Sequence, residues 1–204
     1  MIAELCPKMN AERATALQAI FDAVCLKYAI TDKNDKAAFV AQMCHESGEF
    51  TIKTESMNYT TPQRIVDIWP SRFNLDGSGG KHNANEYIKN SQKLANEVYA
   101  GRMGNGDAAS GDGFRFRGAG FLQMTGREDF GRYAQYIGKD IAETSDLVRN
   151  DDHYAMDSAA WEYVIKSKLL GQKDFVHITK VINGGKIGLE ERTRYYKKAL
   201  EIAA

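Results

Sequence analysis

Residues 36–50 read KAAFVAQMCHESGEF, and this stretch predicts a helix with a glutamate at its end. Four apolar residues recur at the spacing of a helical face and are expected to be buried: Phe39, Val40, Met43 and Cys44. Gly48 stands where a glycine commonly ends a helix. We therefore predict a helix from about Lys36 to Glu46, whose final carboxyl is partly removed from water. Partial burial favours the protonated form of a carboxyl, which suits Glu46 to act as an acid.

The flanking sequence predicts further helices. Apolar residues at helical spacing indicate a helix over about residues 10–29, and Thr61-Pro62 is a typical start for a short helix that ends near Trp69. Residues 51–60 are expected to be extended, and the polar, glycine-rich residues 73–85 to form a loop. Later helices are expected over about residues 86–99, 126–137, 152–168, 173–182 and 189–202. The pattern predicts a mainly α-helical fold with a small irregular β region.

Seven glycines crowd residues 101–120. Glycine at this density indicates a backbone with unusual dihedral angles or a close approach to a ligand. The segment does not have the character of a linker, because Phe114, Phe116 and Phe121 stand among the glycines and need burial.

The composition limits the class of protein. A chain of 204 residues suggests one domain, long enough to bury a core without disulfides or a metal. Lys plus Arg and Asp plus Glu each number 27, whereas nucleic-acid binders usually carry a basic excess, so we expect no nucleic-acid partner. Cys6, Cys25 and Cys44 form no CxxC pair, which disfavours a zinc site or disulfide scaffold. Cys25 and Cys44 lie on apolar helix faces, which predicts buried free thiols.

The sequence also bears on location. The first residues, MIAELCPKMNAERATA, lack the basic patch and apolar run of a signal peptide. No apolar stretch approaches the roughly 20 residues that span a bilayer. We expect a protein made in the cytoplasm and not embedded in a membrane, which must be carried or released to any substrate outside.

A second glutamate follows the first helix end. Glu55 lies nine residues after Glu46, in a segment that can fold back so that the two carboxyls face each other across a groove. Glycosidic cleavage uses such a pair, one as acid and the other to activate water or attack the sugar. By itself the pair also fits solvated glutamates near a helix end. His45 is expected to pack or form hydrogen bonds, because no other His or Cys has the spacing of a metal ligand to it.

The stretches AQMCHESGEF and TESMNY resemble the catalytic region of family 19 glycoside hydrolases, in the phage endolysin branch. The similarity continues in order through YAGRMGNGDAASGDGFRFRGAGFLQMTGREDF, VINGG and ERTRYY, and covers roughly residues 36–196. It implies a lysozyme-like α+β fold of helical lobes that flank a substrate groove. We expect a single catalytic domain over residues 1–204 with no separate wall-binding module.

The resemblance implies an inverting mechanism with Glu46 as general acid and Glu55 as general base. Thr125 is expected to help hold the attacking water. The positions matched to substrate-binding or charge-tuning residues are Asn58, Tyr59, Gln123, Asp129, Asn183 and Arg192. A cation near the base would favour its ionised form. Two simpler interpretations stay open: Arg192 as a surface arginine, and Asn183 as a cap before Gly184.

Three residues depart from the pattern of the family. Ala119 replaces a usual arginine in RGAG, Phe116 stands where tyrosine is common, and Asp129 stands where asparagine often touches substrate. These changes remove two polar groups and add a negative charge. They affect the expected sugar subsites and leave the acid and base in place.

The resemblance favours an endolysin that cuts the β-1,4 bond between N-acetylmuramic acid and N-acetylglucosamine of peptidoglycan. In that setting the protein would act as a monomer on the periplasmic wall after holin-dependent release from the host cytoplasm. The alternatives are a chitinase, a secreted antibacterial effector with the same chemistry, or a non-catalytic sugar-binding module. Hydrolysis by two carboxylates needs no metal and no cofactor, so neither is expected.

Overall fold

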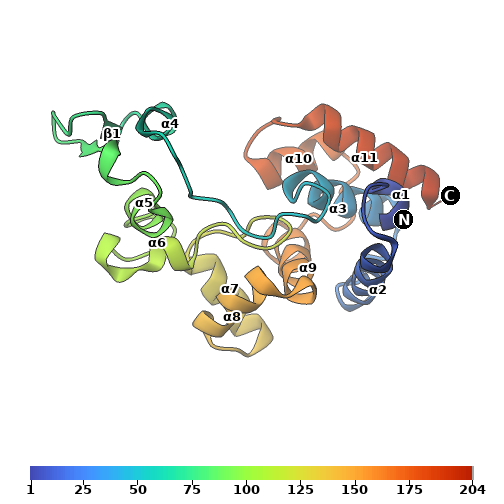
Figure 1. Ribbon diagram of the computed structural model, residues 1–204. Helices are drawn as coiled ribbons and strands as arrows, with labels where there is room; N and C mark the ends of the chain where they lie inside the picture. The colour runs from blue at the N-terminus through green and yellow to red at the C-terminus, as the bar shows by residue number, and fades with distance from the viewer. Residues whose placement is uncertain (204) are drawn as a thin grey trace. The chain divides into compact units, whose positions relative to one another are not determined.

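The computed structural model describes residues 1–203, and they are mainly helical (Figure 1). The α-helices are α1 Ile2–Leu5, α2 Ala11–Lys27, α3 Lys33–Glu46, α4 Pro62–Ile68, α5 Ser91–Val98, α6 Asp112–Arg115, α7 Arg127–Ile137, α8 Ile141–Asn150, α9 Asp152–Trp161, α10 Phe175–Asn183 and α11 Leu189–Ile202. Two 3₁₀ turns cover Ala84–Glu86 and Ala108–Ser110, and a π-helical turn covers Glu162–Lys166. The predicted mainly helical, lysozyme-like fold class is confirmed.

The β structure is small. Strand β1, Phe73–Asn74, pairs in parallel with β2, His82–Asn83, so that Phe73 lies opposite His82. Isolated bridges join Ala119 to Thr54 and to Met124. Residues 73–85, predicted as a loop, therefore contain a short strand pair, and Phe73 of that pair is fully buried.

The chain divides into two compact units. Unit 1 contains Met1–Thr54, Ala119–Met124 and the chain from Asp146 onward, and unit 2 contains Glu55–Gly118 and Thr125–Ser145. The prediction that the whole chain acts as one catalytic domain without a wall-binding module stays a prediction.

Unit 1 is built around α3. Asp32 caps this helix by accepting a hydrogen bond from the Asn34 N–H, so the helix begins three residues before the predicted start at Lys36. Helices α10 and α11 pack on α3, and α2 packs on α9 (Figure 1). The apolar residues predicted for the inner face of α3 are all buried, as are the three free cysteines. Burial raises the pKa of the Cys25 thiol to about 12, so this thiol stays protonated at neutral pH.

Unit 2 has its own apolar core, made by Met57, Ile65, Phe73, Tyr87, Leu94 and their neighbours. The predicted continuous helix over residues 86–99 is wrong. Lys89 has a positive φ of 54°, and its N–H donates to the Tyr59 carbonyl at 2.8 Å, which interrupts the helix. Asn90 then caps α5 by accepting from the Lys93 N–H.

Helices α1, α6 and α8 were not predicted. Asp140 accepts hydrogen bonds from the N–H groups of Ala142 and Glu143 at the start of α8. This helix buries Thr144 and Ser145 completely, so its buried face includes polar side chains and the apolar period is weak. The predicted helix over residues 152–168 divides into α9 and the π-helical turn.

Candidate active site

Glu46 is the last residue of α3, as predicted, and its side chain is 20% exposed. The chain then turns through three residues with positive φ: Gly48, Glu49 and Phe50. Such angles are unfavourable for glutamate and phenylalanine and persist only where the surroundings enforce them. Buried Ser47 does this, because its hydroxyl donates to the Met43 carbonyl at 2.6 Å and accepts from the Phe50 N–H at 2.8 Å. The end of α3 is therefore sharply defined.

Arg192, on α11, is a buried cation in contact with Glu46. Its side chain is 1% exposed, which excludes the alternative of a surface arginine. Nη2 donates to Oε1 of Glu46, Nη1 donates to Oε1 of Gln42, and Nε donates to the Ile187 carbonyl at 3.3 Å. In unit 1 this positive charge acts on the carboxyl assigned as the acid.

Gln42 was not singled out by the sequence. It lies one helical turn before Glu46 on α3 and is fully buried. Its Nε2 donates to the Thr179 hydroxyl of α10 at 3.0 Å. The four-residue spacing places Gln42 and Glu46 on one helix face, which is the signal that could have pointed to it.

His45 pairs with Glu191 of α11, with 2.7 Å between Nδ1 and Oε2. The prediction of a hydrogen-bonding histidine is confirmed. Its ring lies against Gly188, where an added Cβ would come within 2.1 Å of Cε1. The loop before α11 can approach α3 this closely only because residue 188 is glycine.

Asn183 is the last residue of α10, and Gly184, with φ 70°, ends the helix in the left-handed conformation. The Asn183 Nδ2 donates to the Ile187 carbonyl at 3.4 Å, the same carbonyl that accepts from Arg192. The loop 184–188 is therefore tied both to Asn183 and to the cation beside Glu46. A role for Asn183 in substrate binding stays a prediction.

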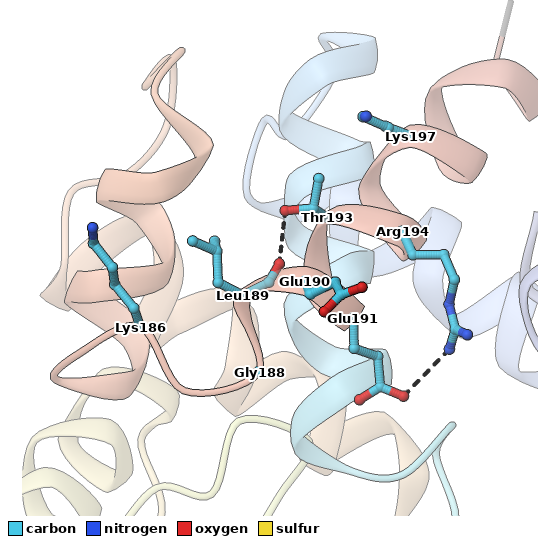
Figure 2. Close-up of a pocket in the computed structure, with 8 residues that line it drawn as sticks. All are labelled: Lys186, Gly188, Leu189, Glu190, Glu191, Thr193, Arg194 and Lys197. Carbon is cyan, nitrogen blue, oxygen red and sulfur yellow. Dashed lines mark hydrogen bonds and ion pairs between the residues drawn. The ribbon is translucent and has the colours of Figure 1, made fainter.

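An open pocket of about 1120 Å³ lies along α11 and the residues before it. Figure 2 shows the residues that line it: Lys186, Gly188, Leu189, Glu190, Glu191, Thr193, Arg194 and Lys197. Glu191, which lines this pocket, pairs with His45 of α3 and, at 3.3 Å, with Arg194. The lining mixes charges of both signs.

Gln123 lies in the tight turn of residues 119–124. It has a positive φ of 56°, and its Nε2 donates to the Gly120 carbonyl at 3.1 Å. Ala119 is fully buried and bridges to both Thr54 and Met124. The missing arginine at this position is thus replaced by a small side chain inside a backbone pairing.

In unit 2, Glu55 is held by neutral donors. The Tyr99 hydroxyl lies 2.9 and 2.8 Å from the two carboxyl oxygens, and the Gly118 N–H donates to Oε2 at 3.2 Å. The Glu55 N–H donates in return to the Gly118 carbonyl at 2.8 Å. Tyr99 lies within the matched motif, but no spacing in the sequence links it to Glu55.

The charge of Glu55 affects its neighbours. Burial and the negative charge of Glu55 raise the pKa of Tyr99 and also that of Tyr59, so both phenols keep their protons. Burial lowers the pKa of Arg117, and the nearby Glu55 opposes this shift. Arg117 is fixed by stacking on Phe114, 3.9 Å from the ring centroid, and by donating to the Phe114 carbonyl.

The other predicted site residues of unit 2 differ in their exposure. Asn58 is exposed, whereas Tyr59 is half-buried with its ring edge against Trp69 at 5.5 Å. Thr125 is half-buried before α7, and Asp129 is half-buried in the first turn of that helix. Phe116 is fully buried, and its ring centroid lies 5.5 Å from that of Phe130.

Within the units, the structure brings Glu46, Arg192 and the Asn183 loop together, and it brings Glu55 close to Tyr59. That the two carboxyls face each other across a groove stays a prediction. Among residues 1–203, no group of three or more His, Cys, Asp or Glu side chains is placed to hold a metal ion. None of the helices in this range has both the length and the apolar character needed to cross a membrane.

Comparisons with known proteins give matches in sequence and in fold. No family model matches the chain. A glycosyl hydrolase family 19 domain-containing protein of Haemophilus influenzae is 32% identical over 189 residues, which cover 89% of this chain and 88% of that protein.

Solved structures share the fold. A family GH19, class IV chitinase from Zea mays has a TM-score of 0.55 and 16% identity, over 91% of this chain and 79% of that one. Chitinase C from Streptomyces griseus has a TM-score of 0.59 and 15% identity, over 98% of this chain and 74% of that one. A bacterial family 19 chitinase has a TM-score of 0.59 and 15% identity, over 98% and 91% of the two chains.

Proposed function

The chain belongs to glycosyl hydrolase family 19, and we propose that it cleaves the β-1,4 bond between N-acetylmuramic acid and N-acetylglucosamine in peptidoglycan. The observation that carries the proposal is the contrast between its two glutamates. Glu46 ends a helix beside a buried cation, and Glu55 accepts from a phenol and a backbone N–H. Two carboxyls in different environments can take different roles in one reaction.

Glu46 is the proposed general acid. It donates its proton to the glycosidic oxygen as the bond from that oxygen to the anomeric carbon breaks. Arg192 donates a hydrogen bond to this carboxyl, which holds it in place at the end of α3.

Glu55 is the proposed general base. It removes a proton from water as the water oxygen bonds to the anomeric carbon, on the face opposite the leaving group, and the configuration inverts. The Tyr99 hydroxyl and the Gly118 N–H stabilise the charged form that a base requires. In the proposal Thr125 holds the water through its hydroxyl.

The remaining predicted residues are proposed sugar contacts: Asn58, Tyr59, Gln123, Asp129 and Asn183. The exposed position of Asn58 and the half-buried positions of the others leave their polar groups within reach of a ligand. Asp129 would accept hydrogen bonds from sugar hydroxyls but would not donate as an asparagine amide does.

The proposed setting is that of a phage endolysin. The protein would be made in the host cytoplasm, reach the periplasmic wall after holin-dependent release, and lyse the host as a monomer. This setting rests on the endolysin-like motifs of residues 36–196.

A second candidate is a chitinase, and the shared fold with three solved chitinases favours it. The same two carboxyls would cut between N-acetylglucosamine units. The two candidates differ in the sugar that carries the cleaved bond.

One experiment separates these candidates. Purified protein is added to permeabilised Gram-negative cells, whose turbidity is followed, and in parallel to soluble chitin oligomers. Clearing of the cells with release of fragments ending in reducing N-acetylmuramic acid supports the proposal, whereas cleavage of chitin alone supports the second candidate. NMR of the first product tests inversion through its α-anomeric configuration. Activity on neither substrate would exclude both, and Glu46→Gln is the inactive control.

A further inference from the structure

A polar network buried inside unit 1 extends beyond the proposed catalytic pair. It links Gln42 of α3, Thr179 of α10 and Arg192 of α11, and all three are at most 1% exposed. Buried polar groups are stable only when their hydrogen bonds are satisfied, and a satisfied network favours one arrangement of its members. The network therefore defines where the Arg192 guanidinium points.

The orientation of the Gln42 amide is set by Thr179. An amide has one acceptor end and one donor end. Because Nε2 of Gln42 donates to the Thr179 hydroxyl at 3.0 Å, Oε1 faces the opposite way and accepts from Nη1 of Arg192. A flipped amide would place two donors against each other at Arg192.

The guanidinium is then held at three points. Nη1 donates to Gln42, Nε donates to the Ile187 carbonyl, and Nη2 is directed at Glu46. Gln42 and the Ile187 carbonyl are neutral, so among these three acceptors only Glu46 carries a charge. A carboxylate in place of the amide would divide the interaction of the single cation between two anions.

We propose that Gln42 and Thr179 are positioning residues that aim Arg192 at Glu46 and reserve its charge for that carboxyl. The proposal rests on the acid role proposed for Glu46. Neither residue touches the reacting atoms. Gln42 acts through Arg192, and Thr179 acts through Gln42.

Other charged groups stand around Glu46 and are unchanged by substitutions in the network. On and after α3 these are His45, paired with Glu191 of α11, and Glu49, which accepts from the Tyr195 hydroxyl at 2.8 Å. Helix α10 contributes the neutral Thr179 to this region, and its His177 and Lys180 side chains are exposed.

The decisive variant is Gln42→Glu. A second carboxylate beside Arg192 makes Glu46 easier to protonate, so the alkaline limb of the pH profile of kcat/KM moves to higher pH, by about one pH unit. The acidic limb, which the proposed base controls, stays in place. Carbon-13 NMR of labelled glutamate side chains, with the Glu46 signal assigned by Glu46→Gln, follows the titration of Glu46 directly. This measurement does not depend on enzymatic activity.

A second pair of variants tests the orientation of Arg192 without adding charge. Thr179→Val frees the amide to turn, and kcat is expected to fall about 10-fold with KM nearly unchanged, because the acid is misplaced while sugar contacts remain. Thr179→Ser keeps the hydroxyl and restores kcat. Should Gln42→Glu fail to fold, this pair decides the proposal.

The outcomes are distinct. An unmoved alkaline limb and an unmoved Glu46 resonance in folded Gln42→Glu would overturn the positioning role, as would equal kcat values for Thr179→Val and Thr179→Ser. Either result, obtained while the native protein is active and Glu46→Gln is not, leaves the proposed function standing. If the native protein cleaves neither polymer, the NMR titration still tests the positioning of the carboxyl.

Discussion

Glu46 in unit 1 accepts a hydrogen bond from an arginine, whereas Glu55 in unit 2 accepts from a phenol and a backbone N–H, so their donors differ in charge and in origin. Glu46 ends a helix and pairs with a buried arginine that three helices hold in place. Glu55 lies in an irregular segment and accepts from a phenol and one backbone N–H. One carboxyl is positioned by a cation, and the other by neutral dipoles.

The difference lies in what each carboxyl would lose with its partner. Removing Arg192 would leave Glu46 without its charged donor, whereas Glu55 would keep the nearby positive charge of Arg117 if it lost the Tyr99 hydroxyl. The contrast predicts that the two sites respond differently to loss of their partners.

The largest expected effects come from the carboxyls themselves. Glu46→Gln and Glu55→Gln should each lower kcat by about 10³-fold, because each removes a proton transfer. Residual activity should lose its alkaline limb in the first variant and its acidic limb in the second, measured by pH profiles of sugar release. Exchanged limbs would mean that the roles of acid and base are reversed.

Removing Arg192 tests the importance of the charged donor to Glu46. Arg192→Met should lower the free energy of unfolding by about 3–5 kcal/mol, because Glu46 and Gln42 lose a buried partner. Arg194→Met on the same helix is the matched control, since Arg194 is 69% exposed and should cost under about 1 kcal/mol. Urea titrations measure both, and equal losses would contradict a structural role for the buried pair.

The backbone beside Glu46 gives a third test. In Gly188→Ala the new Cβ would overlap the His45 ring, so the free energy of unfolding should fall by roughly 1–3 kcal/mol more than in Gly171→Ala. Gly171 is the control because its φ of 79° is also positive while no atom lies within 4 Å of the added Cβ. Equal melting temperatures for the two variants would show that the close approach to His45 does not matter for stability.

The smallest expected effect comes from removing a neutral donor to Glu55. Tyr99→Phe removes the hydroxyl donor to Glu55 and should lower kcat/KM about 10-fold, equivalent to about 1.4 kcal/mol. Tyr87→Phe, which loses a hydroxyl that contacts His82 instead, should leave kcat/KM unchanged. Equal kcat/KM values for Tyr99→Phe and Tyr87→Phe would mean that the Tyr99 hydroxyl does not support the base.

Local sequence predicted α3 well. Its apolar residues repeat at helical spacing, and the chain after Glu46 contains Gly48, so both the buried face and the helix end were foreseeable. The prediction of one continuous helix over residues 86–99 was wrong because of a tertiary contact. The Lys89 N–H bonds to Tyr59, thirty residues earlier, and no local pattern reveals such a partner.

The same distinction between local pattern and tertiary contact applies to the candidate site. The order of motifs in the chain is enough to suggest Glu46, Glu55, Asn183 and Arg192. It did not suggest Gln42, Thr179 or Tyr99, because these residues act through contacts with side chains 137, 150 and 44 positions away.

By itself, the sequence determined that the chain is mainly helical, that Glu46 closes a helix and that its motifs match one family of hydrolases. These properties depend on residue spacing and local backbone preference. Tertiary structure alone decided that a buried arginine contacts Glu46 while a phenol and a backbone N–H contact Glu55. The partners of a buried carboxyl are chosen by packing between distant elements, because every buried polar group must find its donor or acceptor wherever the folded chain places one.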